Sequence, residues 1–451
     1  MRGYPKYKLS QVDLLDEVPS NWEVRRLASF GRFSKGGGIS KSDLVENGIP
    51  AILYGDIYTK YNLKAEKIFN FISQDLAANS KLISKGDLLF TGSGETREDI
   101  GKCIVYSGIS EVYAGGDTII FSQKTNDSLF LAYSLGSNYA ITKKAMNSRG
   151  DIIIHIYSSS LRDIYLPIPS LSEQKQIADF LDYKTEQCDR FIANRQKQIE
   201  LLNEQKQYTL NKIVTEGIYP EQKFQEIENT YIKKIPVNWE FKKLAFISKI
   251  TRLAGYEYTN LWKTKEDGEI IALRGQNVGF NELRNIENAE KISEELSIKL
   301  IRSKLSKGDI VFPCVGTVGK AVLIEEDNKY HINQNIAKIT PSIAVDGLFL
   351  TFLLNSFYTY HQIIHFNTSD AQPNVLVRDL RRFMIPTPPL EEQREIANVI
   401  IDEFNKLDNL ISKYQKQIDL MQEYRTVLIS QAVTGKIDVR EWKPKTKEKT
   451  S

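Results

Sequence analysis

Residues 171–178 read LSEQKQIA directly after a Pro-Ile-Pro-Ser stretch, and residues 390–397 read LEEQREIA directly after Pro-Thr-Pro-Pro. The two sequences lie 219 positions apart. Self-similarity at a fixed distance is the sequence signature of a repeated structural unit. We therefore expect this chain to contain two copies of one module.

Three further blocks repeat in the same order and at nearly the same distance. Residues 19–27 (PSNWEVRRL) return as 236–244 (PVNWEFKKL), residues 85–90 (KGDLLF) as 307–312 (KGDIVF), and residues 196–199 (QKQI) as 415–418 (QKQI). Each repeat is about 218 residues long, far longer than a solenoid unit of roughly 20–50 residues. The chain is therefore a duplicated module and not an array of short repeats.

The first part of each repeat, residues 19–166 and 236–385, mixes short apolar runs with Gly, Asn, Ser and Asp. Short apolar runs bounded by turn residues indicate buried strands, and longer periodic stretches indicate helices. We expect strands at residues 49–54, 117–121, 270–273 and 308–312, and helices at residues 129–139 and 348–362. Each part is then an α+β domain large enough to bury its own core.

The second part of each repeat is predicted to be one long helix. Ser172 is the expected N-cap of the first helix, Glu173 suits its first turn, and Gly217 and Gly435 are expected to end the two helices. One apolar stripe at heptad-like spacing runs along each helix. Its members are Ile177, Leu181, Cys188, Ile192, Ile199, Leu202 and Ile213, and then Ile396, Ile400, Leu407, Ile411, Ile418, Met421 and Leu428.

A helix of about 42 residues, roughly 63 Å long, with one narrow stripe needs a partner helix. The predicted fold is therefore α+β, with two similar globular domains separated by an antiparallel pair of long helices and related by a pseudo-twofold internal repeat. Ordinary core packing of the stripe is the alternative. The expected helix segments are residues 167–217 and 386–435; the other segments are an N-terminal connection (1–18) near the C-terminal helix end, a second connection (218–235) and a flexible tail (436–451).

Composition excludes several classes of protein and leaves DNA binding open. The chain has 60 basic and 57 acidic residues, so any DNA-binding charge must be gathered on one face. Three isolated cysteines without a Cys-x-x-Cys pair argue against a disulfide framework or a zinc site and suit a reducing cytoplasm. No run of 18 apolar residues and no N-terminal apolar stretch is present, so neither a membrane span nor a secretory signal is expected.

The order of these blocks resembles that of the specificity subunit of a type I restriction–modification system. The most specific matches are the two Leu-x-Glu-Gln-x-x-Ile-Ala blocks and the sequences IVTEG at residues 213–217 and AVTGK at residues 432–436. The resemblance implies that residues 19–166 and 236–385 are target recognition domains, each reading one half of a bipartite, asymmetric site in double-stranded DNA. It also implies that the helices set the gap between the half-sites and dock two modification subunits.

The same resemblance implies that this chain has no catalytic residue, cofactor or metal of its own. S-adenosylmethionine would belong to the modification subunits, and ATP to restriction subunits that join them; a methylation-only complex is a close variant. Residues 90–94 (FTGSG) mimic a methyltransferase motif, but the second copy breaks it, which argues against a self-contained methyltransferase. His361 and His365 mimic a zinc-protease motif whose catalytic Glu is replaced by Gln362. A coiled-coil scaffold with two ligand-binding domains is the alternative outside DNA binding.

Polar side chains in predicted loops are the candidates for DNA contact, because Arg, Lys, Asn and Gln match base edges and phosphates. Residues 274–277 (RGQN) are the favoured group, since they follow a predicted strand directly. Ordinary solvated loop residues are the alternative for each candidate. The full set is Lys35, Arg97 and Arg149 in the first domain, and Arg252, Arg274, Gln276, Asn277, Gln372 and Asn374 in the second.

Overall fold

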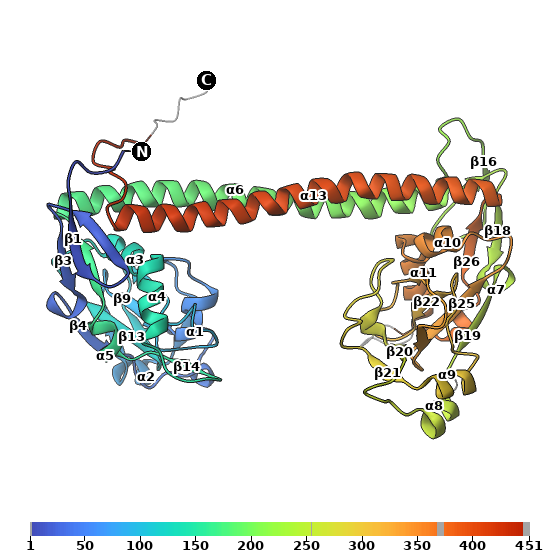
Figure 1. The fold of residues 1–451 in the computed structure, drawn as a ribbon, viewed down its shortest axis with the longest axis horizontal. Coiled ribbons are helices and arrows are strands. Elements are labelled where there is room, and N and C mark those ends of the chain that lie inside the picture. The colour runs from blue at the N-terminus through green and yellow to red at the C-terminus, as the bar shows by residue number, and fades with distance from the viewer. Residues whose placement is uncertain (1, 254, 368–373, 445–451) are drawn as a thin grey trace. The chain divides into compact units, whose positions relative to one another are not determined.

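The computed structural model describes residues 2–253, 255–367 and 374–444 and divides the chain into two compact units. Unit 1 comprises residues 1–196 and 416–451, and unit 2 comprises residues 197–415. Each unit contains one globular part and one part of each of two long helices, α6 (Leu171–Glu216) and α13 (Leu390–Val433) (Figure 1). The predicted α+β class and the two long helices are confirmed.

The globular part of unit 1 contains a five-stranded and a four-stranded sheet. The five-stranded sheet has the order β4 (Arg32–Lys35), β13 (Thr118–Ser122), β9 (Leu88–Thr91), β11 (Cys103–Tyr106) and β6 (Lys64–Ala65). The four-stranded sheet has the order β7 (Asn70–Ile72), β5 (Ile49–Ile52), β12 (Val112–Ala114) and β8 (Lys81–Ile83). The consecutive helices α3 (Ser128–Leu135) and α4 (Asn138–Met146) follow β13, and Leu131 shares a buried cluster with Leu181 and Leu428 of the long helices.

The globular part of unit 2 has the same plan. One sheet has the order β19 (Ser248–Arg252), β25 (Ile336–Pro341), β22 (Ile310–Pro313) and β23 (Val322–Leu323), and the other β21 (Glu290–Ile292), β20 (Ile270–Leu273) and β24 (Tyr330–Ile332). The strand register also repeats. Lys35 and Phe90 both lie opposite Ile119 in unit 1, and Arg252 and Phe312 both lie opposite Ala337 in unit 2.

Short elements complete both units. A two-stranded sheet joins β3 (Glu23–Arg26) to β15 (Tyr165–Ile168) in unit 1, and β18 (Glu240–Lys243) to β26 (Met384–Thr387) in unit 2. The short α-helices are α1 (Tyr54–Thr59), α2 (Gln74–Ala78), α5 (Ser158–Arg162), α7 (Leu244–Ile247), α8 (Gly255–Leu261), α9 (Glu294–Lys299) and α12 (Val377–Leu380). The 3-10 turns are η1 (Leu27–Ser29), η2 (Lys41–Asp43) and η3 (Gly275–Asn277).

Two predicted single helices are each two helices in the structure. The stretch 129–139 divides into α3 and α4, because Ser137 accepts a hydrogen bond from the backbone N–H of Ala140 and caps a new helix. The stretch 348–362 divides in the same way into α10 (Gly347–Leu354) and α11 (Phe357–Phe366), with Ser356 as the cap. The strand predicted at residues 49–54 also ends early, at Ile52, because Tyr54 begins α1.

The ends of the long helices follow the prediction closely, with one correction. The N-cap of α6 is Ser170 and not Ser172: its hydroxyl accepts from Glu173 N at 3.4 Å, and its carbonyl accepts from Gln174 N at 2.9 Å. Gly217 and Gly435 end the two helices as predicted, with φ of +83° and +74°. Glycine adopts this left-handed conformation at a helix end without a side-chain clash.

A buried glutamate joins the start of each long helix to the repeated tryptophan. In unit 1, Glu173 Oε1 accepts hydrogen bonds from the Trp22 indole at 3.2 Å and from the Tyr4 hydroxyl at 2.7 Å. In unit 2, Glu392 Oε1 accepts from the Trp239 indole at 2.9 Å. The two sequence blocks that repeat most clearly, Pro-x-x-Trp-Glu and Leu-x-Glu-Gln, are therefore in direct contact within each unit.

The glutamine that follows each glutamate makes a second buried connection. Gln174 accepts from Asp127 N at 2.8 Å and donates to Pro169 O at 2.9 Å. Gln393 accepts from Asp346 N at 2.8 Å and donates to Pro388 O at 2.8 Å. Because Asp127 and Asp346 are the N-caps of α3 and α10, each glutamine ties a helix of the globular part to the start of a long helix.

The long helices run antiparallel within each unit. In unit 1, Gln176 of α6 donates to the carbonyl of Trp442, just beyond α13, and Asp189 pairs with Arg425 at 3.2 Å. In unit 2, Lys206 pairs with Asp408 at 2.6 Å, and Tyr219, just beyond α6, donates to Glu395. The predicted stripe is only partly buried. Ile177, Leu181, Cys188, Ile396, Ile400, Ile418 and Leu428 are buried, whereas Ile192, Ile199, Leu202, Ile213, Leu407, Ile411 and Met421 are half-buried.

The N-terminal segment from Arg2 and the segment that follows α13 lie together in unit 1. The Tyr7 hydroxyl donates to Gly435 O at 3.0 Å, and Asp438 N donates to Arg2 O at 2.9 Å. The expectation of a flexible tail from residue 436 is wrong for residues 436–444, because Ile437 and Val439 are buried in the core; residues 445–451 lie outside the described part.

The connecting segments belong to the repeat as well. The hairpin of β1 (Tyr7–Val12) and β2 (Leu15–Pro19) places Tyr7 opposite Pro19. The hairpin of β16 (Phe224–Glu226) and β17 (Lys234–Pro236) places Phe224 opposite Pro236 in the same way. The predicted domain starts at residues 19 and 236 therefore fall at the ends of two equivalent hairpins.

Replacing Glu173 by Ala is expected to destabilise unit 1 and leave unit 2 unchanged. The substitution leaves the buried Trp22 indole and Tyr4 hydroxyl without their acceptor, at a cost of about 1–3 kcal/mol for each unsatisfied group. Native-state hydrogen exchange measures this effect as a lower opening free energy for unit 1 amides. Glu392→Ala is the matched control and must give the reverse pattern; equal loss in both units would contradict the two separate anchors.

Candidate nucleic-acid interface

Several loops of unit 1 meet at one edge of its sheets. We call this surface the loop edge of unit 1 and define it as residues 35–41, 53–60, 91–97, 115–117 and 147–155. The loops are tied together by Lys35, which pairs with Asp117 at 3.5 Å, by Gly92 N, which donates to Asp117 O at 2.6 Å, and by the Tyr58 hydroxyl, which donates to Ser93 O at 3.1 Å. The edge therefore presents side chains that are far apart in the sequence on one surface.

The two loops that carry Arg97 and Arg149 are in direct contact. The strands β10 (Ser93–Gly94) and β14 (Ile154–His155) pair antiparallel. Arg97 donates to Gly150 O at 3.0 Å and to the Ser148 hydroxyl at 3.4 Å. Arg149 is held through its backbone, and its exposed guanidinium has no hydrogen-bond or ion-pair partner among the described residues. Arg97 thus supports the loop, whereas the Arg149 side chain is available to a ligand.

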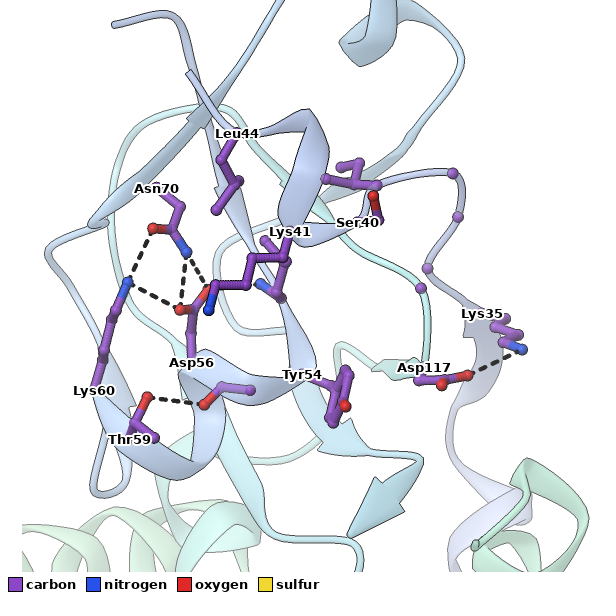
Figure 2. A pocket seen from close by; sticks show the side chains of 17 residues that line it. Lys35, Ser40, Lys41, Leu44, Tyr54, Asp56, Thr59, Lys60, Asn70 and Asp117 are labelled. Carbon is purple, nitrogen blue, oxygen red and sulfur yellow. Dashed lines mark hydrogen bonds and ion pairs between the residues drawn. The ribbon is translucent and has the colours of Figure 1, made fainter. Parts of the chain in front are cut away.

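A hollow of about 890 Å³ lies beside Lys35 at this edge (Figure 2). Its polar wall is a closed network: Lys60 pairs with Asp56 at 3.0 Å and donates to Asn70 at 2.9 Å, and Asn70 donates to Asp56 at 2.8 Å. Lys41 is exposed on the rim and has no ion-pair partner among the described residues. Lys35 and Lys41 are therefore the cations that this hollow offers to an anionic ligand.

Two titratable groups lie under the loops rather than on them. Burial raises the pKa of the Tyr58 phenol, so the hydroxyl stays protonated near neutral pH and donates to the loop backbone. Burial lowers the pKa of Lys144 to about 8, and its amine donates to Gly101 O at 2.7 Å. Tyr58 is half-buried and Lys144 is buried, and both donate to backbone carbonyls and so hold their segments in place.

Unit 2 presents an equivalent edge with different side chains. Arg252 occupies the strand position that Lys35 has in unit 1, as the shared register shows. Asn374 lies opposite Val315, as His155 lies opposite Ser93. The predicted candidates Lys35 and Arg252 are therefore one position of the repeat, identified twice.

The favoured group at residues 274–277 divides into exposed and buried members. Gln276 is exposed, and Arg274 is half exposed and paired with Glu290. Asn277 is only 1% exposed; it accepts from Arg274 N at 2.9 Å and donates to Arg284 O at 3.1 Å. This burial argues against the predicted DNA contact of Asn277, because its amide is used to close its own turn, as Asp56 closes the equivalent turn through Leu53 N.

The remaining sequence motifs have structural roles. Gln372 lies outside the described residues. Phe90 and Thr91 of the FTGSG stretch are buried in β9, and a Cβ on Gly92 would lie 2.8 Å from Asp117 O, so glycine permits the close approach of these two backbone segments. His361 stacks on Tyr231 at 5.6 Å. Among residues 2–253, 255–367 and 374–444, no group of three or more possible metal ligands gathers.

Sequence reasoning missed two features of the loop edge. One is Lys41, which lies three residues after the Gly-rich stretch 36–38 and could have been found from that stretch. The other is the pair Ile152 and Ile153, which are 90% and 57% exposed on the loop that follows Arg149. Apolar residues in a predicted loop give no sequence signal for exposure, since buried strands have the same composition.

Known proteins resemble the chain over nearly its whole length. The sequence matches the family model of the type I restriction modification DNA specificity domain twice, over residues 19–201 and 236–420. The type I restriction enzyme MjaVIII specificity subunit of Methanocaldococcus jannaschii is 28% identical over 434 residues, which cover 94% of this chain and 94% of that protein. The type I restriction enzyme EcoBI specificity subunit of Escherichia coli is 27% identical over 297 residues, which cover 64% of this chain and 62% of that protein.

Solved structures share the fold. A chain from a study of complex assembly and conformational transition of the type I R-M system has a TM-score of 0.69 at 15% identity, covering 93% of this chain and 99% of that chain. The HsdS subunit from Thermoanaerobacter tengcongensis has a TM-score of 0.52 at 14% identity, covering 93% of this chain and 98% of that subunit. In the part of the chain that the structure describes, no helix is both long enough and apolar enough to span a membrane.

Replacing Asn277 by Ala is expected to lower the stability of unit 2 by about 1–3 kcal/mol, because backbone groups that it satisfies in the turn lose their partner. Gln276→Ala, one residue away and exposed, is expected to leave stability unchanged. Urea unfolding followed by hydrogen exchange in unit 2 measures both effects. A stable Asn277→Ala protein with weakened DNA binding would restore Asn277 as a DNA contact.

Proposed function

The chain belongs to the family of type I restriction modification DNA specificity domains, and on that basis we propose that it is the non-catalytic DNA-reading subunit of a type I restriction–modification complex. Each unit reads one half of a bipartite, asymmetric site in double-stranded DNA. The long helices set the gap between the two half-sites. The chain works in the cytoplasm, where DNA is accessible to the complex.

One observation carries this proposal: the two loop edges share a backbone frame and differ in the side chains that the frame presents. The strand end that carries Lys35 in unit 1 carries Arg252 in unit 2. The turn that begins with Leu53 in unit 1 begins with Arg274 in unit 2. Two copies of one backbone arrangement with different side chains are suited to binding two different base sequences on one DNA molecule. Two different half-sites make the whole target asymmetric.

The exposed polar groups at these edges have the chemistry of DNA contacts. Arg149 offers a fork of donors that matches the acceptors of guanine, and the Gln276 amide matches adenine. Lys35 and Lys41 offer ammonium groups, which contact phosphates without reading sequence. Both kinds of contact are needed, because phosphate contacts fix position and base contacts give specificity.

Catalysis belongs to other subunits in this proposal. Modification subunits supply S-adenosylmethionine chemistry, and restriction subunits supply ATP-driven cleavage. The FTGSG turn fits this division, since its backbone packs directly against Asp117.

Each unit also offers one apolar surface on its long helices for a modification subunit. In unit 1 the exposed apolar side chains of α13 are Leu420, Tyr424 and Val427; in unit 2 those of α6 are Leu201 and Tyr208. Leu201 and Leu420 are equivalent positions of the repeat, as are Tyr208 and Val427. Exposed apolar patches mark interaction sites, and two equivalent patches support two modification subunits for each chain.

Exchanging residues 244–383 for those of a relative tests the two-reader proposal. The exchange keeps the β18–β26 pair and the Trp239–Glu392 contact, so the new loops enter an intact frame. Methylome sequencing of cells that express the assembled complex is expected to show one changed half-site and one unchanged half-site. A change in both halves contradicts separate readers, and a complex that footprints no DNA supports the scaffold alternative.

Replacing Leu420 by Glu is expected to remove one modification subunit from the complex. A charge in an apolar contact loses burial energy and leaves an unpaired charge at the interface. Native mass spectrometry should give two modification subunits on the wild-type chain, one on Leu420→Glu or Leu201→Glu, and none on the double variant. Gln417→Glu, on an exposed part of α13, is the control and should retain both; loss of both subunits from a single variant would contradict two independent surfaces.

A further inference from the structure

The loop between Arg149 and His155 exposes two consecutive isoleucines. Ile152 is 90% exposed and Ile153 is 57% exposed. The base of the loop is closed by two backbone hydrogen bonds, from Arg149 N to His155 O at 2.9 Å and from His155 N to Arg149 O at 2.7 Å. These side chains therefore stand on a closed hairpin-like loop.

The loop is braced in this conformation. Arg97 donates to Gly150 O at 3.0 Å. Gly150 has φ of +106°, and a Cβ at this residue would lie 2.1 Å from Ile153 O, so only glycine fits the turn. A braced loop cannot easily fold back to bury Ile152 in its own unit, so the apolar tip remains available to a ligand.

Exposure alone does not mark this site, because other isoleucines are equally exposed. Ile109 is 94% exposed, but it lies at the opposite end of the sheet from the loop edge, beyond Tyr106, whose carbonyl accepts from Gly86 N. Ile343 of unit 2 is 100% exposed and follows β25, which ends opposite Ser248 at the start of β19. Neither residue has a second exposed isoleucine beside it or lies at a loop edge.

The charged residues near Ile152 determine which part of DNA this loop tip can contact. Arg149 and Lys35 attract the phosphate backbone toward the loop edge. Asp151, next to Ile152, is fully exposed and lies 3.8 Å from Arg97; its carboxylate is repelled by phosphates but can accept a hydrogen bond from the N4 amine of cytosine. A tip with a carboxylate and isoleucines is therefore suited to base edges inside a groove, with the cations nearer to the backbone.

We infer that Ile152 is a specificity-determining residue of unit 1 that packs against the C5-methyl group of a thymine in the major groove. This inference rests on the proposed DNA-reading function. Of the four bases, only thymine presents a methyl group in the major groove, so apolar contact there distinguishes it from the others. A hydrogen-bonding side chain cannot recognise a methyl group. An apolar loop tip can therefore contribute specificity that the polar side chains of the loop edge cannot.

Deoxyuridine in place of thymine tests the contact, because it removes the methyl group and leaves the base-pairing groups unchanged. The complex of this chain with its modification subunits is titrated with unmethylated duplexes that carry the sequence motif which methylome sequencing identifies. In these duplexes each thymine of the unit 1 half-site is replaced in turn. At one position the substitution should weaken wild-type binding about threefold to fivefold, the effect expected for one buried methyl group. Ile152→Ala should bind less tightly than wild type and should be insensitive to deoxyuridine at that position.

Ile109→Ala is the matched control and should keep wild-type affinity and wild-type sensitivity to deoxyuridine. An Ile152→Ala complex that binds its motif normally and remains sensitive, or a unit 1 half-site without thymine, overturns the inference while specific binding still supports the proposed function. Loss of a modification subunit from Ile152→Ala, with DNA binding otherwise normal, makes the tip a protein contact and also overturns it. A wild-type complex that does not discriminate between its motif and a scrambled duplex refutes the proposed function itself.

Discussion

The buried carboxylate at the start of each long helix is the contact on which the rest of the structure depends. A carboxylate removed from water is costly unless its lone pairs are satisfied. In unit 1 the Trp22 indole satisfies Glu173, and in unit 2 the Trp239 indole satisfies Glu392. Removal of the glutamate leaves the buried indole without its acceptor, and removal of the indole takes one donor from a buried carboxylate. This mutual requirement explains why the tryptophan block and the Glu-Gln block repeat together although more than 140 residues separate them in each copy.

The contact between the buried glutamate and the tryptophan fixes the strands and helices of each unit but does not constrain the side chains of the loop edge. In each unit it holds the strand after the tryptophan, the start of the long helix and, through Gln174 or Gln393, the first helix after the central strands. The loop edge lies at the far end of those strands, away from these contacts. Loop side chains can therefore differ between the two copies, as Lys35 and Arg252 do, without a change in the strand register that presents them. Specificity and stability are carried by different residues.

The frame could be predicted from the sequence because its signals are local and repeated. The long helices have a continuous periodic stripe, and Gly217 and Gly435 mark their ends. The divisions at Ser137 and Ser356 were missed because the apolar pattern continues across each break, although both serines are good helix caps. The site was harder to predict, because it depends on contacts between distant segments. Arg97 and Arg149 were identified as separate candidates, but only the fold brings their loops together, and an exposed asparagine cannot be distinguished by sequence from Asn277, which closes its own turn.

The near balance of 60 basic and 57 acidic residues bears on how such a protein can select DNA. Several candidate cations are already paired with acids at the loop edges: Lys35 with Asp117, Arg97 with Asp151, and Arg274 with Glu290. Exposed ion pairs are worth about 0–1 kcal/mol, so a phosphate or a base edge can replace the acid at little cost. Non-specific binding to DNA depends mainly on the number of phosphates neutralised. Because the chain as a whole has little net charge, its long-range attraction to arbitrary DNA is weak, so specific binding depends on the local contacts at the two loop edges.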